Sequence, residues 1–80
     1  MHPLDPVALT VDARNLACPL PVIRARRGIG TVTVGEMVEV LTTDPGSIAD
    51  FRAWTQSTGH ELVGVVEDGP PFKFLIRRVR

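Results

Sequence analysis

The sequence predicts a two-layer α/β (α+β) sandwich in the order β-α-β-α-β-β. Apolar residues alternate in short segments, recur at helical spacing in two others, and are separated by junctions rich in proline and glycine. Because crossovers between parallel strands are right-handed, both helices are expected on one face of a four-stranded mixed sheet. A chain of 80 residues has room for one core, so we expect a single domain, 1–80, with residues 1–7 as a flexible N-terminal extension.

The first strand and the first helix are predicted in the N-terminal half. The strand is predicted from alternation, and its apolar members are Leu9, Val11 and Ala13. The helix is predicted from Pro19 onward, where the apolar residues at intervals of three and four are Val22, Ala25 and Ile29. Gly28 and Gly30 offer a stop with a left-handed backbone.

The second half predicts a strand, a helix and a terminal hairpin. Residues 36–43 have valines at period two, which indicates a strand covered on at least one face. Asp44 is expected to cap the second helix with Pro45 at its first position, and Gly59 lies just past its end. The apolar stripe of this helix is Ile48, Phe51 and Trp54, which we interpret as packing residues. The runs 61–67 and 72–79 flank an Asp-Gly-Pro-Pro turn.

The composition argues against several functional classes. Nine basic and nine acidic residues cancel, so the net charge gives no reason to expect direct nucleic-acid binding. The apolar runs are too short to span a membrane. One cysteine cannot form an intrachain disulfide, and residues 1–8 lack the features of a secretory signal, so we expect a cytoplasmic protein. One cysteine and two histidines make no convincing zinc site, and no metal is expected.

The segment Cys18-Pro19-Leu20-Pro21 lies at the junction of the first strand and the first helix. A residue before proline favours extended geometry, so Cys18 is expected to be the helix N-cap, and prolines are tolerated in the first turn. There the helix dipole and the N–H of Leu20 would favour a negative sulfur and lower the cysteine pKa below its usual value of about 8.5. The segment therefore predicts a reactive, exposed thiol.

Two other interpretations of Cys18 remain open from the pattern alone. Pro21 disfavours helical geometry at Leu20, so the helix could begin at Pro21 and leave Cys18 exposed in the preceding loop, with a weaker effect of the dipole. Alternatively, Cys18 is a buried and inert residue, because free cysteine is among the most buried residue types.

Arginines surround the Cys18 segment in the sequence and make its neighbourhood locally positive. These candidate anion or partner contacts are Arg14, Arg24, Arg26 and Arg27. The last three fit a solvated helix face as well as a surface that docks an acidic partner or stabilises an anionic thiosulfate or persulfide. Asp44 is a further candidate contact, although capping alone explains it. His60 is disfavoured as a general base for Cys18 because nothing in the pattern brings the two together.

Residues 11–23, Val-Asp-Ala-Arg-Asn-Leu-Ala-Cys-Pro-Leu-Pro-Val-Ile, resemble the signature of the TusA-like (SirA/YedF) sulfur-carrier family. Further similarities bring the coverage to nearly the whole chain, about 9–78: Gly35-Glu36, Thr43-Asp44-Pro45, His60-Glu61-Leu62 and Phe74-Leu75-Ile76-Arg77. Many relatives have an acidic residue where this chain has Leu20, and a glycine where it has Asn15. Leu20 makes the rim of the site apolar, and asparagine can adopt the left-handed backbone of glycine, so these departures bear on partner choice.

The resemblance implies a sulfur carrier in which Cys18 accepts sulfane sulfur as a persulfide and relays it to an acceptor protein. Pro19, Leu20 and Pro21 would shape the site, and no cofactor is implied beyond the covalent sulfur on Cys18. The donor would be a cysteine desulfurase, a rhodanese or a similar protein, and the acceptor would serve tRNA thiolation, sulfur oxidation or cofactor sulfuration. If the protein is an enzyme, it is a sulfurtransferase that acts as a protein-bound persulfide carrier. We expect the isolated protein to be a monomer.

Two other classes of function are compatible with the sequence. A non-catalytic regulatory or protein-interaction module would use the same exposed rim, and Cys18 would then be dispensable. A peroxide sensor or dithiol reductase ranks third, because the chain has no second cysteine to resolve an oxidised intermediate.

Overall fold

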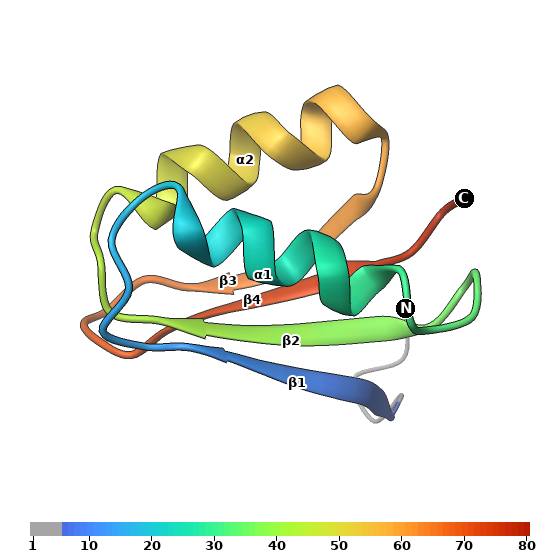
Figure 1. Ribbon diagram of the computed structural model, residues 1–80, viewed down its shortest axis with the longest axis horizontal. Coiled ribbons are helices and arrows are strands. Elements are labelled where there is room, and N and C mark those ends of the chain that lie inside the picture. The colour runs from blue at the N-terminus through green and yellow to red at the C-terminus, as the bar shows by residue number, and fades with distance from the viewer. Residues whose placement is uncertain (1–5) are drawn as a thin grey trace.

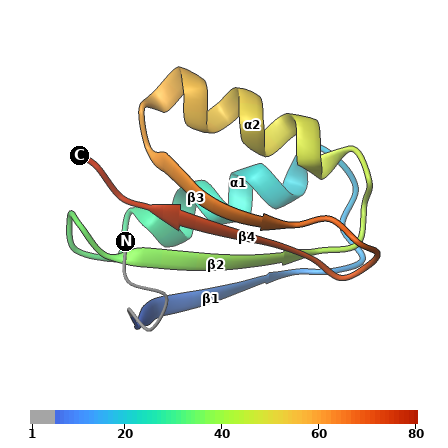
Figure 2. The same ribbon diagram turned by 180° about the vertical axis from the view of Figure 1, so that it is seen from behind.

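The computed structural model describes residues 6–80, and within them the elements follow the predicted order (Figure 1). The strands are β1 (Val7–Ala13), β2 (Met37–Thr42), β3 (Glu61–Val66) and β4 (Phe72–Arg77), and the helices are α1 (Leu20–Ile29) and α2 (Ser47–Thr58). The sheet order is β1-β2-β4-β3, with β1 parallel to β2 and β4 antiparallel to both of its neighbours. Both helices cover one face of the sheet (Figures 1 and 2), which confirms the two-layer sandwich.

Strand β1 begins two residues earlier than the alternating pattern predicted. Val7 pairs with Met37 of β2, and the register shifts before Leu9. Val7 is exposed, although its backbone belongs to the sheet. The extension expected over residues 1–7 therefore overlaps the sheet at Val7, and its first five residues lie outside the part of the chain that the structure describes.

The core lies between the sheet and the two helices. Its buried members are Ala13, Ala25, Ile29, Val38, Val40, Phe51, Phe72, Phe74 and Ile76. Phe51 of α2 stacks on Phe74 of β4 with ring centroids 4.5 Å apart, and Trp54 meets Phe51 edge-on at 6.2 Å. Trp54 is half-buried at the margin of this cluster, which confirms the predicted packing role. Helix α2 is therefore fixed on the sheet by aromatic packing.

Two glycines shape helix α1, in different ways. Gly30 follows the helix with a φ of −65°, so the prediction that a glycine with a left-handed backbone ends this helix is wrong. The chain instead continues through a right-handed turn, in which the N–H of Thr31 donates to the Gly28 carbonyl at 3.0 Å. Gly28 is buried inside the helix, and a Cβ there would lie 2.7 Å from Cγ2 of Val11. The close approach of α1 to β1 thus depends on the missing side chain. By contrast, Gly59 ends α2 as expected, with a φ of 82°.

Replacing Gly28 with alanine is expected to lower the free energy of unfolding by about 1–3 kcal/mol, because the added methyl group overpacks the contact with Val11. Urea denaturation measures this difference. The matched control is Gly30→Ala, where the backbone is right-handed and a Cβ has ordinary room. Equal stability of the two variants would contradict the close-packing role of Gly28.

One end of the molecule gathers the segments that matter for the site. The carboxyl ends of β1 and β2, the amino ends of α1 and α2, and the β3–β4 turn all lie there (Figures 1 and 2). The turn is the predicted Asp-Gly-Pro-Pro segment, with Gly69 at a φ of 119°. Within residues 6–80, neither helix is long and apolar enough to cross a membrane.

Candidate functional site

The loop that carries Cys18 is tied to the segment that follows β2. After β1, Asn15 adopts a left-handed backbone with a φ of 65°, as its residue type allowed. The backbone N–H of Asn15 donates to Oγ1 of Thr43 at 2.8 Å. Leu16 packs against the core, and Pro21 is fully buried on the other side of the loop. The loop is thus anchored on both sides of Cys18.

Cys18 is exposed and lies in the loop before helix α1. The helix begins at Leu20 with Pro19 as its N-cap, and the Cys18–Pro19 peptide bond is cis. The expectation that Cys18 caps the helix is therefore wrong, because the N–H of Leu20 closes a turn with the carbonyl of Ala17 at 2.9 Å instead of facing the sulfur. The placement of Cys18 in the preceding loop is right, although the helix starts at Leu20 rather than Pro21, and the buried alternative is excluded.

Asp44 holds the backbone of Cys18. Its carboxylate Oδ2 accepts a hydrogen bond from the Cys18 N–H at 3.1 Å. The prediction that Asp44 caps α2 with Pro45 in its first turn is wrong, because the carboxylate is turned toward the loop and the cap residue is Gly46. The Asp44 carbonyl accepts hydrogen bonds from the backbone N–H and the hydroxyl of Ser47. Asp44 therefore joins the start of α2 to the Cys18 loop.

Asp50, in the first turn of α2, is a site residue that sequence reasoning missed. Its carboxylate accepts a hydrogen bond from the Cys18 thiol; this bond, desolvation of the sulfur, and the negative charges of Asp50 and Asp44 raise the pKa of Cys18. The predicted lowering of this pKa is therefore wrong in sign. No sequence motif signals the contact, because Asp50 reaches the thiol only through the packing of α2 beside the loop.

The arginines near Cys18 in the sequence do not surround its sulfur. Arg14 forms an ion pair with Asp12 at 2.9 Å, and Nη1 of Arg24 donates to the backbone carbonyl of Asp12 at 3.3 Å. Arg26 and Arg27 lie in the last turn of α1, at the other end of the helix from Cys18. The charged groups that act on the thiol are two carboxylates, so the positive stretch of sequence does not produce a positive environment at the sulfur.

The hydrogen bonds from Arg14 lower the pKa of the Asp12 carboxyl to about 2. Because the folded-state pKa is depressed, the contribution of this pair to stability is present above the unfolded value and is lost as the pH falls through 2. We expect a carboxyl-carbon NMR titration to find Asp12 charged down to about pH 2, and Arg14→Gln to raise this pKa toward about 3.9. A wild-type midpoint near 4 would contradict the pairing.

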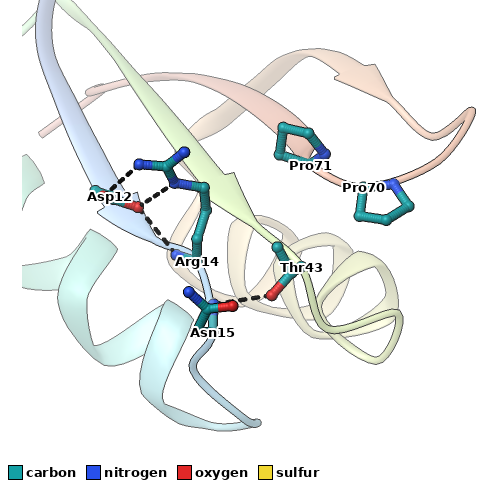
Figure 3. Close-up of a pocket in the computed structure, with 6 residues that line it drawn as sticks. All are labelled: Asp12, Arg14, Asn15, Thr43, Pro70 and Pro71. Atoms are coloured by element: carbon teal, nitrogen blue, oxygen red, sulfur yellow. Dashed lines mark hydrogen bonds and ion pairs between the residues drawn. The ribbon is translucent and has the colours of Figure 1, made fainter.

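A shallow pocket of about 360 Å³ opens beside the Cys18 loop (Figure 3). Its lining residues come from the end of β1, the segment after β2 and the β3–β4 turn: Asp12, Arg14, Asn15, Thr43, Pro70 and Pro71. Cys18 does not line it, and the charges of Asp12 and Arg14 compensate each other inside it (Figure 3). The exposed Cys18 thiol therefore lies outside this pocket.

Other candidate chemistry is remote from the thiol. His60 lies beyond the carboxyl end of α2, where its Nδ1 accepts a hydrogen bond from the Val79 N–H at 3.1 Å. Burial, followed by the charges of Arg80 and Arg78, lowers the pKa of His60. Among residues 6–80, no group of three or more histidine, cysteine or acidic side chains is arranged to hold a metal ion.

Comparisons with known proteins agree on one family. The family model described as sulfurtransferase TusA matches residues 9–78. The chain is 43% identical over 68 residues to the sulfur carrier protein TusA of Allochromatium vinosum, covering 85% of this chain and 90% of the relative. It is 37% identical over 68 residues to the putative sulfur carrier protein YrkI of Bacillus subtilis, covering 85% and 91%. A crystal structure of a SirA-like protein from Desulfitobacterium hafniense superposes with a TM-score of 0.76 at 26% identity, covering 90% of this chain and 99% of that one.

Proposed function

Because the chain belongs to the TusA family of sulfur carrier proteins, we propose that Cys18 accepts sulfane sulfur as a persulfide and relays it to an acceptor protein. The observation that carries this proposal is the exposure of the only cysteine in the chain, on a loop anchored on both sides. An exposed thiol is open to the sulfur of a donor protein, and an anchored loop presents it in one place.

The mounting of Cys18 supports this role. Asp44 accepts a hydrogen bond from the backbone N–H of Cys18 and so holds the loop through its main chain. Pro19 caps α1 immediately after the thiol, Leu20 is 48% exposed at the rim, and Pro21 is fully buried against the core. The two prolines restrain the backbone of the site, and Leu20 makes its rim apolar.

The outer face of α1 supplies a surface on which partners dock. Leu20 and Ile23 are exposed apolar residues on this helix, 48% and 41% accessible. A shallow groove of about 510 Å³ continues from Ile23 past Arg26 and Arg27. The helix contains no acidic residue, so the surface fits a partner that combines acidic and apolar groups. The donor we propose is a cysteine desulfurase, a rhodanese or a similar protein, and the carrier works in the cytoplasm as a monomer that docks each partner in turn.

The test is sulfur loading by an enzymatic donor. The protein is incubated with a cysteine desulfurase and L-cysteine, and its intact mass is recorded before and after reduction. The proposal predicts a gain of one sulfur atom that a thiol reductant removes. A protein that binds the desulfurase but never gains sulfur would instead be a non-catalytic interaction module.

A further inference from the structure

We propose that two buried hydroxyl groups, those of Thr42 and Ser47, form a latch that positions Cys18 for sulfur transfer. The latch acts through the connector between β2 and α2, whose residues Thr43 and Asp44 hold the Cys18 loop. The inference rests on the proposed function of Cys18 and adds two positioning residues to that site.

The hydroxyl latch lies in the core where β2 meets α2. Thr42 is the last residue of β2, Ser47 is the first residue of α2, and both are fully buried. Their side-chain oxygens are 2.6 Å apart. The Ser47 hydroxyl donates to the Asp44 carbonyl at 2.7 Å, and a hydroxyl has only one proton to donate. Thr42 is therefore the donor to Ser47, and the two hydroxyls form a chain that ends at the backbone of Asp44.

Stability alone does not explain two hydroxyls at this place. A buried hydroxyl costs free energy unless it is hydrogen-bonded, and replacing both partners of such a bond by apolar groups of the same shape is nearly neutral. Valine in place of Thr42 and alanine in place of Ser47 would fill nearly the same space. What the pair supplies is direction, because a satisfied buried network holds its members in one arrangement. Here the arrangement that it holds is that of the connector.

The connector in turn holds the loop that carries Cys18. Oγ1 of Thr43 accepts the backbone N–H of Asn15 at 2.8 Å (Figure 3), and Oδ2 of Asp44 accepts that of Cys18 at 3.1 Å. A Cβ on Gly46 would lie 3.3 Å from the same Asp44 oxygen, so the missing side chain leaves room for the carboxylate. The connector is thus fastened to the core at both ends and to the loop between them.

A fixed backbone at Cys18 matters for transfer between two proteins. With its main chain held, Cys18 places its sulfur by rotation about the Cα–Cβ bond, which has few staggered positions. A docked donor then meets the sulfur in a small set of places. Because misplacing reacting groups by about 1 Å can slow a reaction by about 100-fold, a loose loop would slow transfer without weakening docking. The latch is therefore expected to act on kcat and to leave KM for the carrier unchanged.

The double variant Thr42→Val/Ser47→Ala tests the latch, because it removes both hydroxyls and leaves neither without its partner. Amide hydrogen exchange in the free protein should show the Cys18 N–H exchanging about five-fold faster than in the wild type. Sulfur loading by a cysteine desulfurase, measured at increasing carrier concentrations, should show kcat lowered by about three-fold to ten-fold at an unchanged KM. Thr42→Val alone, which leaves the bond from Ser47 to Asp44 in place, should move both quantities in the same direction by a smaller factor.

Two control variants separate the positioning of Cys18 from damage to the fold. Thr42→Ser keeps the hydroxyl but removes a buried methyl group, so it should unfold at a lower urea concentration and yet restore the wild-type exchange rate and kcat. Thr55→Val removes another buried hydroxyl of α2, one that donates to the Phe51 carbonyl at 2.9 Å, and should change neither quantity.

Wild-type exchange at Cys18 in the double variant would overturn the latch, and faster exchange with an unchanged kcat would overturn its role in transfer. Equal losses of kcat in the double variant and in Thr55→Val would also reject it, because any buried hydroxyl would then serve as well. The exchange measurement needs no donor, so it separates the two proposals. Faster exchange in the double variant, with no sulfur gained by any protein including the wild type, would reject the carrier role of Cys18 while upholding the hold of the latch on its loop.

Discussion

Replacing Cys18 with serine is expected to abolish sulfur loading entirely. Serine keeps the size and hydrogen-bonding capacity of the side chain, but its oxygen cannot hold sulfane sulfur as a persulfide. The residue is exposed, so the free energy of unfolding should change by no more than about 0.5 kcal/mol. Intact mass after incubation with a cysteine desulfurase measures loading, and urea denaturation verifies the fold.

The matched control for this substitution is Ala17→Ser. Ala17 is the exposed neighbour of Cys18 in the same loop, so the variant introduces a hydroxyl there while leaving the thiol in place. It should load one sulfur atom, as the wild type does. Sulfur gained by Cys18→Ser would show that the cargo is carried elsewhere and would reject the proposed role of Cys18.

Replacing Phe51 with alanine is expected to lower the free energy of unfolding by about 3–5 kcal/mol. Phe51 is fully buried and contacts Phe74 and Trp54, so truncation leaves a cavity between α2 and the sheet. That loss is a large part of the total stability of about 5–15 kcal/mol typical of a small domain. Urea denaturation monitored by circular dichroism measures it.

The control for Phe51 lies next to it on the same helix. Arg52 is exposed and forms an ion pair with Glu67 at 2.7 Å, so Arg52→Ala should cost no more than about 1 kcal/mol. A loss of similar size in both variants would mean that the core contacts of Phe51 do not dominate the stability of α2.

The fold follows from local patterns that a single sequence displays. Alternating apolar residues in β1, the spacing of Val22, Ala25 and Ile29 in α1, and the Asp-Gly-Pro-Pro turn each depend on near neighbours in the chain. The handedness of crossovers then leaves little choice of topology. For these reasons the two-layer sandwich was predictable, including the placement of both helices on one face of the sheet.

The chemistry around Cys18 was less predictable because it is set by packing between distant segments. The helical pattern placed Asp44 at a cap, whereas its carboxylate turns to the Cys18 backbone, 26 positions away. Asp50 reaches the thiol only once α2 is packed beside the loop. Charge near Cys18 in the sequence was a poor guide to the charge near its sulfur, since Arg14 folds back onto Asp12. The sign of the pKa shift of Cys18 therefore depended on tertiary structure.

Isotope transfer tests the carrier role most directly. The protein is loaded with ³⁵S from labelled L-cysteine and a cysteine desulfurase, separated from the donor, and treated with cyanide, which takes up sulfane sulfur as thiocyanate. We predict one labelled atom per chain, confined to the peptide that contains Cys18 and fully recovered in thiocyanate. Label that is absent, that lies on another peptide, or that resists cyanide would contradict sulfur delivery by Cys18.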